Sequence, residues 1–159
     1  LVDPQGFLRQ KDSTNNIILK KTDLDLSDVN AIKINPEEGQ NIVSGSHDEM
    51  MLALQKKGIE YVLLTNKSDV SLLVKNRIYS LKLPNKNIHD TTGIGDIFCS
   101  AFTCTMLKEK DFLWALCFAA GSAQAALESN NVGLQKIPKK GMVENNASYF
   151  YNLVDFRDL

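Results

Sequence analysis

The 159-residue sequence lacks a long apolar run and an excess of charge of either sign. No apolar stretch approaches the ~20 residues that a membrane-spanning helix needs. Lysine and arginine together number 18 and aspartate and glutamate 19, so the net charge is -1. Such a balance offers no broad basic surface for nucleic acid or for an anionic membrane. We therefore expect a small-molecule ligand, and neither nucleic acid nor a membrane as a partner.

Cysteine is also scarce, with Cys99, Cys104 and Cys117 in apolar stretches that we expect to be helical. An odd number argues against a disulfide framework, and the spacing matches no zinc pattern. We expect all three to be small buried residues of a cytoplasmic protein. The length and the 43% apolar content suit one domain with its own core over residues 1–159.

Apolar patterning alternates between strand-like and helix-like segments. Helices are expected at 46–57, 94–108, 112–129 and 142–154, and strands at 17–19, 31–35, 61–65, 70–74 and 77–83. The first of these helices begins with a capping box, Ser46 and Glu49, and Asp111 caps the one at 112–129. Pro36 stops the strand at 31–35, Lys75-Asn76 forms the turn of a hairpin, and 130–140 is a loop. Such alternation is typical of an α/β fold with a mainly parallel sheet, in which ligands lie beyond the carboxyl ends of the strands. The opening Leu-Val-Asp-Pro resembles the end of a buried strand, so we expect a longer protein to precede it.

The segment Asp90-Thr-Thr-Gly-Ile-Gly-Asp96 stands directly before the apolar helix expected at 94–108. Glycines allow a sharp turn and close approach to a ligand, and the first amides of a helix attract anions. Asp96 could then take the proton from a hydroxyl that attacks a phosphoryl group. Alternatively, Asp96 only caps the helix and the glycines only form a turn. The segment is neither a P-loop nor a dinucleotide fingerprint, because the lysine of the one and the third glycine of the other are missing.

Three motifs together resemble the ribokinase-like (pfkB-type) carbohydrate kinases. Asp90-Thr-Thr-Gly-Ile-Gly-Asp-Ile-Phe98 is similar to the family's C-terminal signature, Asp-Thr-x-Gly-Ala-Gly-Asp-x-Phe. Asn35-Pro-Glu-Glu38 resembles its Asn-x-x-Glu motif, and Asp3-Pro-Gln-Gly-Phe-Leu-Arg9 resembles a strand-end segment that opens with Asp-Pro. The resemblance covers nearly the whole chain but only the C-terminal portion of the family's length.

This resemblance implies a three-layer α/β/α, Rossmann-like fold without the N-terminal strands and the lid. It also implies an ATP-dependent phosphotransferase that moves the γ-phosphoryl group to an alcohol of a sugar or polyol, as a homodimer in the intact protein. Whether the isolated chain is active is left open. A nucleoside or inositol kinase of the same family is one alternative, and a non-catalytic nucleotide- or anion-binding domain is another.

The resemblance also implies roles for individual residues. Asp96 would be the catalytic base; the other expected site residues are Thr92, Gly93, Ile94 and Gly95 for the anion, Asp3, Gln5 and Arg9 for substrate or phosphate, Asn35 and Glu38 for Mg²⁺ through water, Asp90 and Thr92 for a monovalent cation such as K⁺, and Thr65, Lys67 and Gly121 for ATP.

Some positions depart from the family's pattern or carry a second interpretation. Lys67 and Val70 stand where the family usually has glycines, and Ile94 replaces an alanine. The small residues around Gly121 would leave room for adenine or would allow two helices to pack closely. His89 would sense the cation or the phosphate, or lie on the surface.

Overall fold

The computed structural model describes residues 1–84, 90–129 and 131–159, so the expectations for His89 and for Asn130 in a loop lie outside it. The described chain divides into two units. The first consists of Leu1–Tyr79 with Phe156–Leu159, and the second is Ser80–Asp155.

A five-stranded sheet runs in the order β3-β4-β5-β6-β7. Its strands are β3 (Ala31–Ile34), β4 (Tyr61–Thr65), β5 (Asp69–Val74), β6 (Arg77–Lys82) and β7 (Asp155–Asp158). β3 and β4 are parallel, and Val2 adds a parallel bridge to Ile32, whereas β4 and β5 are antiparallel. The sheet is therefore mixed, where the alternation of elements suggested a mainly parallel one.

The turn between β5 and β6 has the geometry that its sequence predicts. Lys75 and Asn76 have φ angles of 48° and 62°. Two positive φ angles in a two-residue loop are the mark of the hairpin turn that matches strand twist. β7 was not expected. It is held at the hairpin by Arg77, whose Nε lies 2.6 Å from Asp158 Oδ1.

The helices of the first unit are α1 (Gln5–Leu8), α2 (Pro36–Ile42) and α3 (His47–Lys56). α3 begins at the predicted capping box, because Ser46 and Glu49 each accept a hydrogen bond from the other's backbone amide. Its Met51 and Leu54 belong to the same buried apolar cluster as Val62 of β4. A small hairpin of β1 (Arg9–Lys11) and β2 (Ile17–Leu19) completes this unit.

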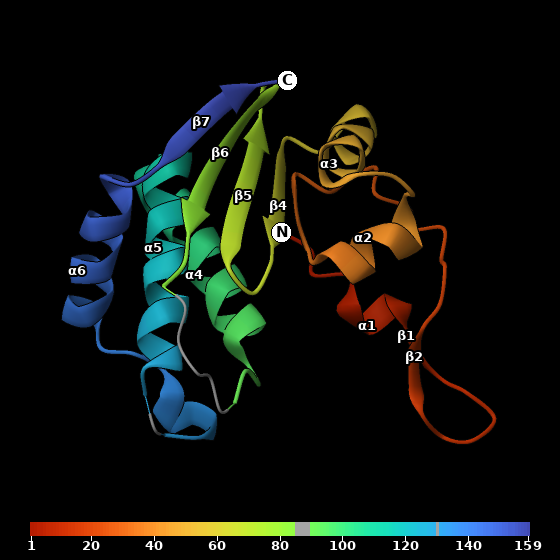
Figure 1. Cartoon of the computed structure of the whole chain (residues 1–159), viewed down its shortest axis with the longest axis horizontal. Coiled ribbons are helices and arrows are strands. Elements are labelled where there is room, and N and C mark those ends of the chain that lie inside the picture. The colour runs from red at the N-terminus through yellow and green to blue at the C-terminus, as the bar shows by residue number, and fades with distance from the viewer. Residues whose placement is uncertain (85–89, 130) are drawn as a thin grey trace. The chain divides into compact units, whose positions relative to one another are not determined.

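The second unit is helical, with α4 (Ile94–Glu109), α5 (Phe112–Leu127), the 3₁₀ turn η1 (Gly133–Lys136) and α6 (Lys140–Tyr151). α5 lies between α4 and α6 (Figure 1). Asp111 caps α5 as expected, because its carboxylate accepts from the amides of Leu113 and Trp114 at 2.9 and 3.0 Å. Within the described ranges, no helix is both long and apolar enough to cross a membrane.

The sequence suggested that all three cysteines are buried, but only one of them is. Cys117 is buried in α5, and burial raises the pKa of its thiol to about 12. Cys99 is half-buried and Cys104 is exposed on α4. The expectation was wrong for Cys104, because the apolar content of α4 is spread around the helix, so composition alone does not identify its buried face.

Candidate functional site

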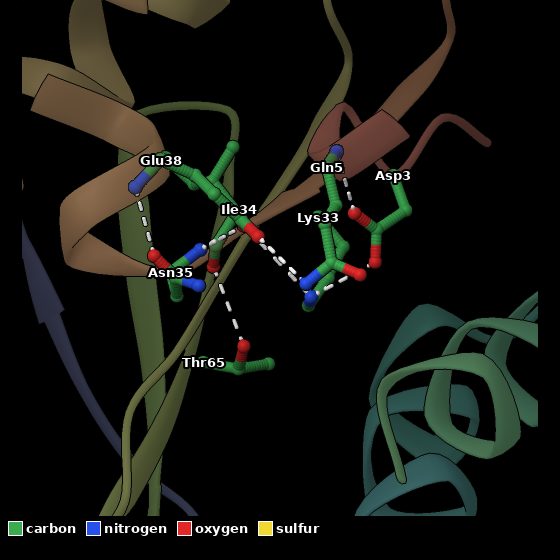
Figure 2. Close-up of polar contacts among 7 residues, drawn as sticks. All are labelled: Asp3, Gln5, Lys33, Ile34, Asn35, Glu38 and Thr65. Carbon is green, nitrogen blue, oxygen red and sulfur yellow. Dashed lines mark hydrogen bonds and ion pairs between the residues drawn. The ribbon is translucent and has the colours of Figure 1, made fainter. Parts of the chain in front are cut away.

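The end of β3 carries a tightly bonded pair, Asn35 and Glu38 (Figure 2). Asn35 Oδ1 accepts a hydrogen bond from the Glu38 amide at 2.8 Å, and Glu38 Oε2 accepts one from the Asn35 amide at 2.9 Å. These two bonds form a capping box at the start of α2, and Pro36 takes the first helical position, where its missing N–H costs nothing. The Asn-x-x-Glu motif thus fixes the direction in which the chain leaves the strand.

Lys33 lies between the two acidic side chains of this region, and the sequence reasoning missed it. It is only 6% exposed. Its Nζ lies 2.9 Å from Asp3 Oδ2 and 3.9 Å from Glu38 Oε2. The available signal was a lysine inside the otherwise apolar run Ala31-Ile-Lys-Ile34, since lysine is rarely buried without a partner.

Gln5 donates hydrogen bonds to the same two carboxylates (Figure 2). Its backbone amide donates to Asp3 Oδ1 at 3.1 Å, and its Nε2 donates to Glu38 Oε1 at 3.5 Å. Asp3, Gln5 and Glu38, which belong to two separate sequence motifs, therefore form one hydrogen-bonded cluster with Lys33.

Direct binding of Mg²⁺ does not fit this cluster. Glu38 is 1% exposed, and both of its oxygens accept hydrogen bonds. The Lys33 ammonium supplies a positive charge beside them. Among the residues that the structure describes, no group of three His, Cys, Asp or Glu side chains could hold a metal ion. The role of Asn35 and Glu38 toward Mg²⁺ through water stays a prediction.

The other expected residues of the first unit differ in their surroundings. Thr65 ends β4, and its hydroxyl donates to the Ile34 carbonyl at 3.4 Å, beside the cluster (Figure 2). Lys67 is exposed in the turn 66–69, which closes with a hydrogen bond from the Asn66 amide to the Asp69 carbonyl at 2.8 Å. Arg9 is exposed in the β1–β2 hairpin. The structure does not bring Arg9 or Lys67 into the bonded cluster.

In the second unit, the glycine-rich segment forms the start of α4. Gly93 is the N-cap residue, in the left-handed conformation with φ 77°. The Ile94 amide donates to the Thr91 carbonyl at 3.2 Å. Within the part of the chain that the structure describes, the amides of Gly93 and Gly95 donate no such bond. An anion at this helix start would therefore draw on Gly93 and Gly95 rather than on Ile94.

Asp96 lies in the first turn of α4 and is exposed. A carboxylate there is stabilised by the positive end of the helix dipole, so its place suits a helix-capping charge. Its exposure leaves it accessible to an incoming hydroxyl. Both interpretations from the sequence remain compatible with this position.

Lys136 is the second residue that the sequence reasoning missed. It ends η1, is 3% exposed, and its Nζ donates to Asp90 O, Asp90 Oδ2 and Thr92 O at 2.9, 3.0 and 3.3 Å. The pKa of Asp90 is lowered to about 2, first by the Thr92 amide, then by the Thr92 hydroxyl and by Lys136. The oxygens expected to bind a monovalent cation thus already surround an ammonium group.

Gly121, expected near the nucleotide, faces α6. A Cβ on this glycine would lie 2.9 Å from both Ala147 N and Val143 O. Asn146 Nδ2 also donates to the Gly121 carbonyl, at 3.3 Å. The glycine therefore permits close packing of α5 on α6, which was the alternative interpretation of this stretch.

Several solved structures resemble the chain at low sequence identity. A pyrophosphate-dependent myo-inositol-1 kinase, changed by mutation into a myo-inositol-3 kinase, has TM-score 0.72 and 18% identity, over 94% of this chain and 53% of that one. Ribokinase from Thermotoga maritima has TM-score 0.68 and 18% identity, over 77% of this chain and 43% of that one. Arabidopsis thaliana ribokinase complexed with ribose and ATP has TM-score 0.63 and 20% identity, over 77% of this chain and 42% of that one.

These likenesses confirm the ribokinase-like α/β fold. The chain spans about half the length of these structures or less. Comparison with curated protein sequences finds no significant match. The family comparison is more decisive, because the sequence matches the pfkB family of carbohydrate kinases over residues 8–140. The chain therefore belongs to the pfkB family of carbohydrate kinases.

Proposed function

We propose that this chain is the phosphoryl-transfer portion of a cytoplasmic kinase that uses ATP and Mg²⁺ to phosphorylate an alcohol of a sugar or polyol. The observation that carries the proposal is the start of α4. A left-handed Gly93 opens the helix there, and Asp96 is exposed in its first turn. Helix amides that can hold an anion and a carboxylate that can accept a proton are thereby joined in four consecutive residues.

The chemistry follows from that arrangement. The acceptor hydroxyl attacks the γ-phosphorus, its O–P bond forms, and the bond from phosphorus to the leaving diphosphate oxygen breaks. The hydroxyl proton passes to the Asp96 carboxylate. The amides of Gly93 and Gly95 hold the negative charge on the phosphoryl oxygens. Mg²⁺ bound to the nucleotide would neutralise part of the charge of its phosphates. None of these steps requires a residue of this chain to bind Mg²⁺.

Replacement of the proposed base tests the function directly. Asp96→Asn in the full-length protein should lower kcat by about 10²–10⁴-fold, because a positioned general base contributes about that much. The KM for ATP should change little, since the amide keeps the size of the carboxylate. The measurement is steady-state phosphorylation of a panel of sugars and polyols.

Glu109→Gln is a matched control, because Glu109 is an exposed acid at the other end of the same helix. Its turnover should equal that of the wild type. Near-normal turnover in Asp96→Asn would contradict the assignment of the base. ATP binding in a calorimeter without product from any acceptor would instead favour a non-catalytic nucleotide-binding domain.

A second candidate is an inositol kinase that uses pyrophosphate in place of ATP, and the donor side of the chain gives a specific reason to test it. Gly121 is covered by α6, and the turn that carries Lys67 lacks the family's glycines. Both features argue against a wide adenine site at these positions. One similar structure is a pyrophosphate-dependent myo-inositol kinase. Initial rates with ATP or pyrophosphate, each combined with ribose, a nucleoside or myo-inositol, would separate the two candidates.

A further inference from the structure

Lys136 is buried against the Asp90–Gly93 loop, by which we mean the four residues before α4. An ammonium group has three N–H donors and no acceptor. The three acceptors that it meets are two main-chain carbonyls, Asp90 O and Thr92 O, and one carboxylate oxygen, Asp90 Oδ2. Every donor of this side chain is therefore used on the loop.

We propose that Lys136 serves as the built-in cation of the Asp90–Gly93 loop, so that this loop holds its shape without a monovalent metal ion. The inference deepens the proposed function. It rests on that function only in assuming that the loop binds the phosphoryl group. It replaces the expectation of K⁺ at Asp90 and Thr92, which does not fit. A second cation on the same oxygens would lie beside the ammonium and be repelled by it.

The position of Lys136 has a consequence for the neighbouring amide. The peptide bond is planar and trans, so its C=O and its N–H point in opposite directions. The Thr92 carbonyl points toward Lys136 Nζ at 3.3 Å. The Gly93 N–H of the same peptide therefore points away from the lysine. Lys136 is thus a positioning residue for one of the two amides proposed to hold the phosphoryl group.

The anchoring is reinforced on the loop itself. Asp90 Oδ1 accepts from the Thr92 amide at 2.9 Å, while Oδ2 accepts from Lys136. One carboxylate thus holds the backbone of the loop and the lysine together. The lysine is brought by η1, which lies 46 residues along the chain from Asp90. The ion pair ties the two segments.

Thermal unfolding of the full chain in different salts tests the proposal. At equal ionic strength, the wild-type Tm should be the same in potassium chloride and in tetramethylammonium chloride. Lys136→Ala should lower the Tm by several degrees in tetramethylammonium chloride, and K⁺ should restore part of that loss, because the vacated oxygens can then bind it. Selective stabilisation of the wild type by K⁺, or no effect of K⁺ on Lys136→Ala, would overturn the proposal.

Two further variants sharpen the experiment. Lys136→Met removes the charge but fills the space, so it should be destabilised without any recovery in K⁺. Lys139→Ala removes an exposed lysine three residues away and should behave as the wild type. Recovery of Lys136→Met by K⁺ would mean that the ion binds elsewhere and would overturn the proposal.

A measurement on the unmodified chain remains available if Lys136→Ala fails to fold. Titration of potassium chloride into the wild type, followed by the NMR shifts of the Thr92 and Gly93 amides, should give no saturable change. A saturable change that is absent with tetramethylammonium would contradict the proposal. None of these readouts needs turnover, so the role of Lys136 can be confirmed even in a chain without kinase activity. Failure of the Lys136 proposal leaves the proposed reaction to be tested separately.

Discussion

Lys33 Nζ and Asp3 Oδ2 lie 2.9 Å apart, in an ion pair that joins β3 to the segment before α1. The two side chains are 7% and 23% exposed, so water screens them little. The same ammonium stands 3.9 Å from the buried Glu38 carboxylate. One lysine thus compensates two acids from two sequence motifs.

Lys33→Met should lower the free energy of unfolding by about 3–5 kcal/mol, because removing one partner of a buried pair leaves the other charge uncompensated. Urea unfolding of the full chain measures this. Lys21→Met, at an exposed lysine, should change the stability by less than about 0.5 kcal/mol.

The double variant Lys33→Met/Glu38→Gln should be more stable than Lys33→Met alone, since it removes the charge left behind. If the effects of the two substitutions on the free energy of unfolding are additive instead, Lys33 is not coupled to Glu38 and the description of the cluster is wrong.

Gly93→Ala should lower the free energy of unfolding by about 1–2 kcal/mol. The φ angle of 77° at this N-cap is costly for any residue with a Cβ, although nothing lies within 4 Å of the added atom. Gly141→Ala is the matched control, because this glycine also has open space but sits in the first turn of α6 without a positive φ. It should gain up to about 1 kcal/mol from helix propensity. Equal effects of the two substitutions would contradict the argument from backbone conformation.

The elements that the sequence predicted well are those with a local signal. The capping box of α3, the Asp111 cap of α5 and the Lys75-Asn76 turn each depend on residues a few positions apart. α2 was missed because Pro36 was interpreted only as the stop of a strand, whereas proline also begins helices. β7 was missed because all four of its residues are exposed, so it has no apolar alternation.

The candidate site was predictable only in part for a related reason. Asp3, Gln5, Asn35 and Glu38 were found because they lie in recognisable motifs. Lys33 and Lys136 act through long-range pairing, with carboxylates 30 and 46 residues away. Only Lys33 carries a local signal of burial, its place inside an apolar strand, whereas Lys136 stands in a stretch expected to be a loop and carries none.

Acid should weaken the Asp90–Gly93 loop in a defined range. The pKa of Asp90 in the folded chain is lowered from 3.8 to about 2, first by the Thr92 amide. A carboxylate whose pKa is lower in the folded chain than in the unfolded chain stabilises the fold. That stabilisation is complete above the unfolded pKa and is lost as the pH falls through the folded pKa. The wild type should therefore exceed Asp90→Asn in Tm at neutral pH, and the difference should shrink between about pH 4 and pH 2. A difference that stays constant over this range would contradict the ionic role of Asp90.

Gly121→Ala should destabilise the chain by up to about 2 kcal/mol, despite the higher helix propensity of alanine. The added Cβ would lie 2.9 Å from Ala147 N and Val143 O, which are backbone atoms of α6 and cannot turn aside. Overpacking of this kind typically costs about 1–3 kcal/mol, of which the propensity returns about 1. Urea unfolding measures the loss.

The affinity for ATP then decides between the two roles of Gly121. If the glycine serves helix packing, the folded fraction of Gly121→Ala should bind ATP with the wild-type Kd, because the added methyl group points at α6. A Kd raised tenfold or more at full folding would instead place the nucleotide against this face of α5. The stability loss and the affinity loss thus separate packing from recognition at one position.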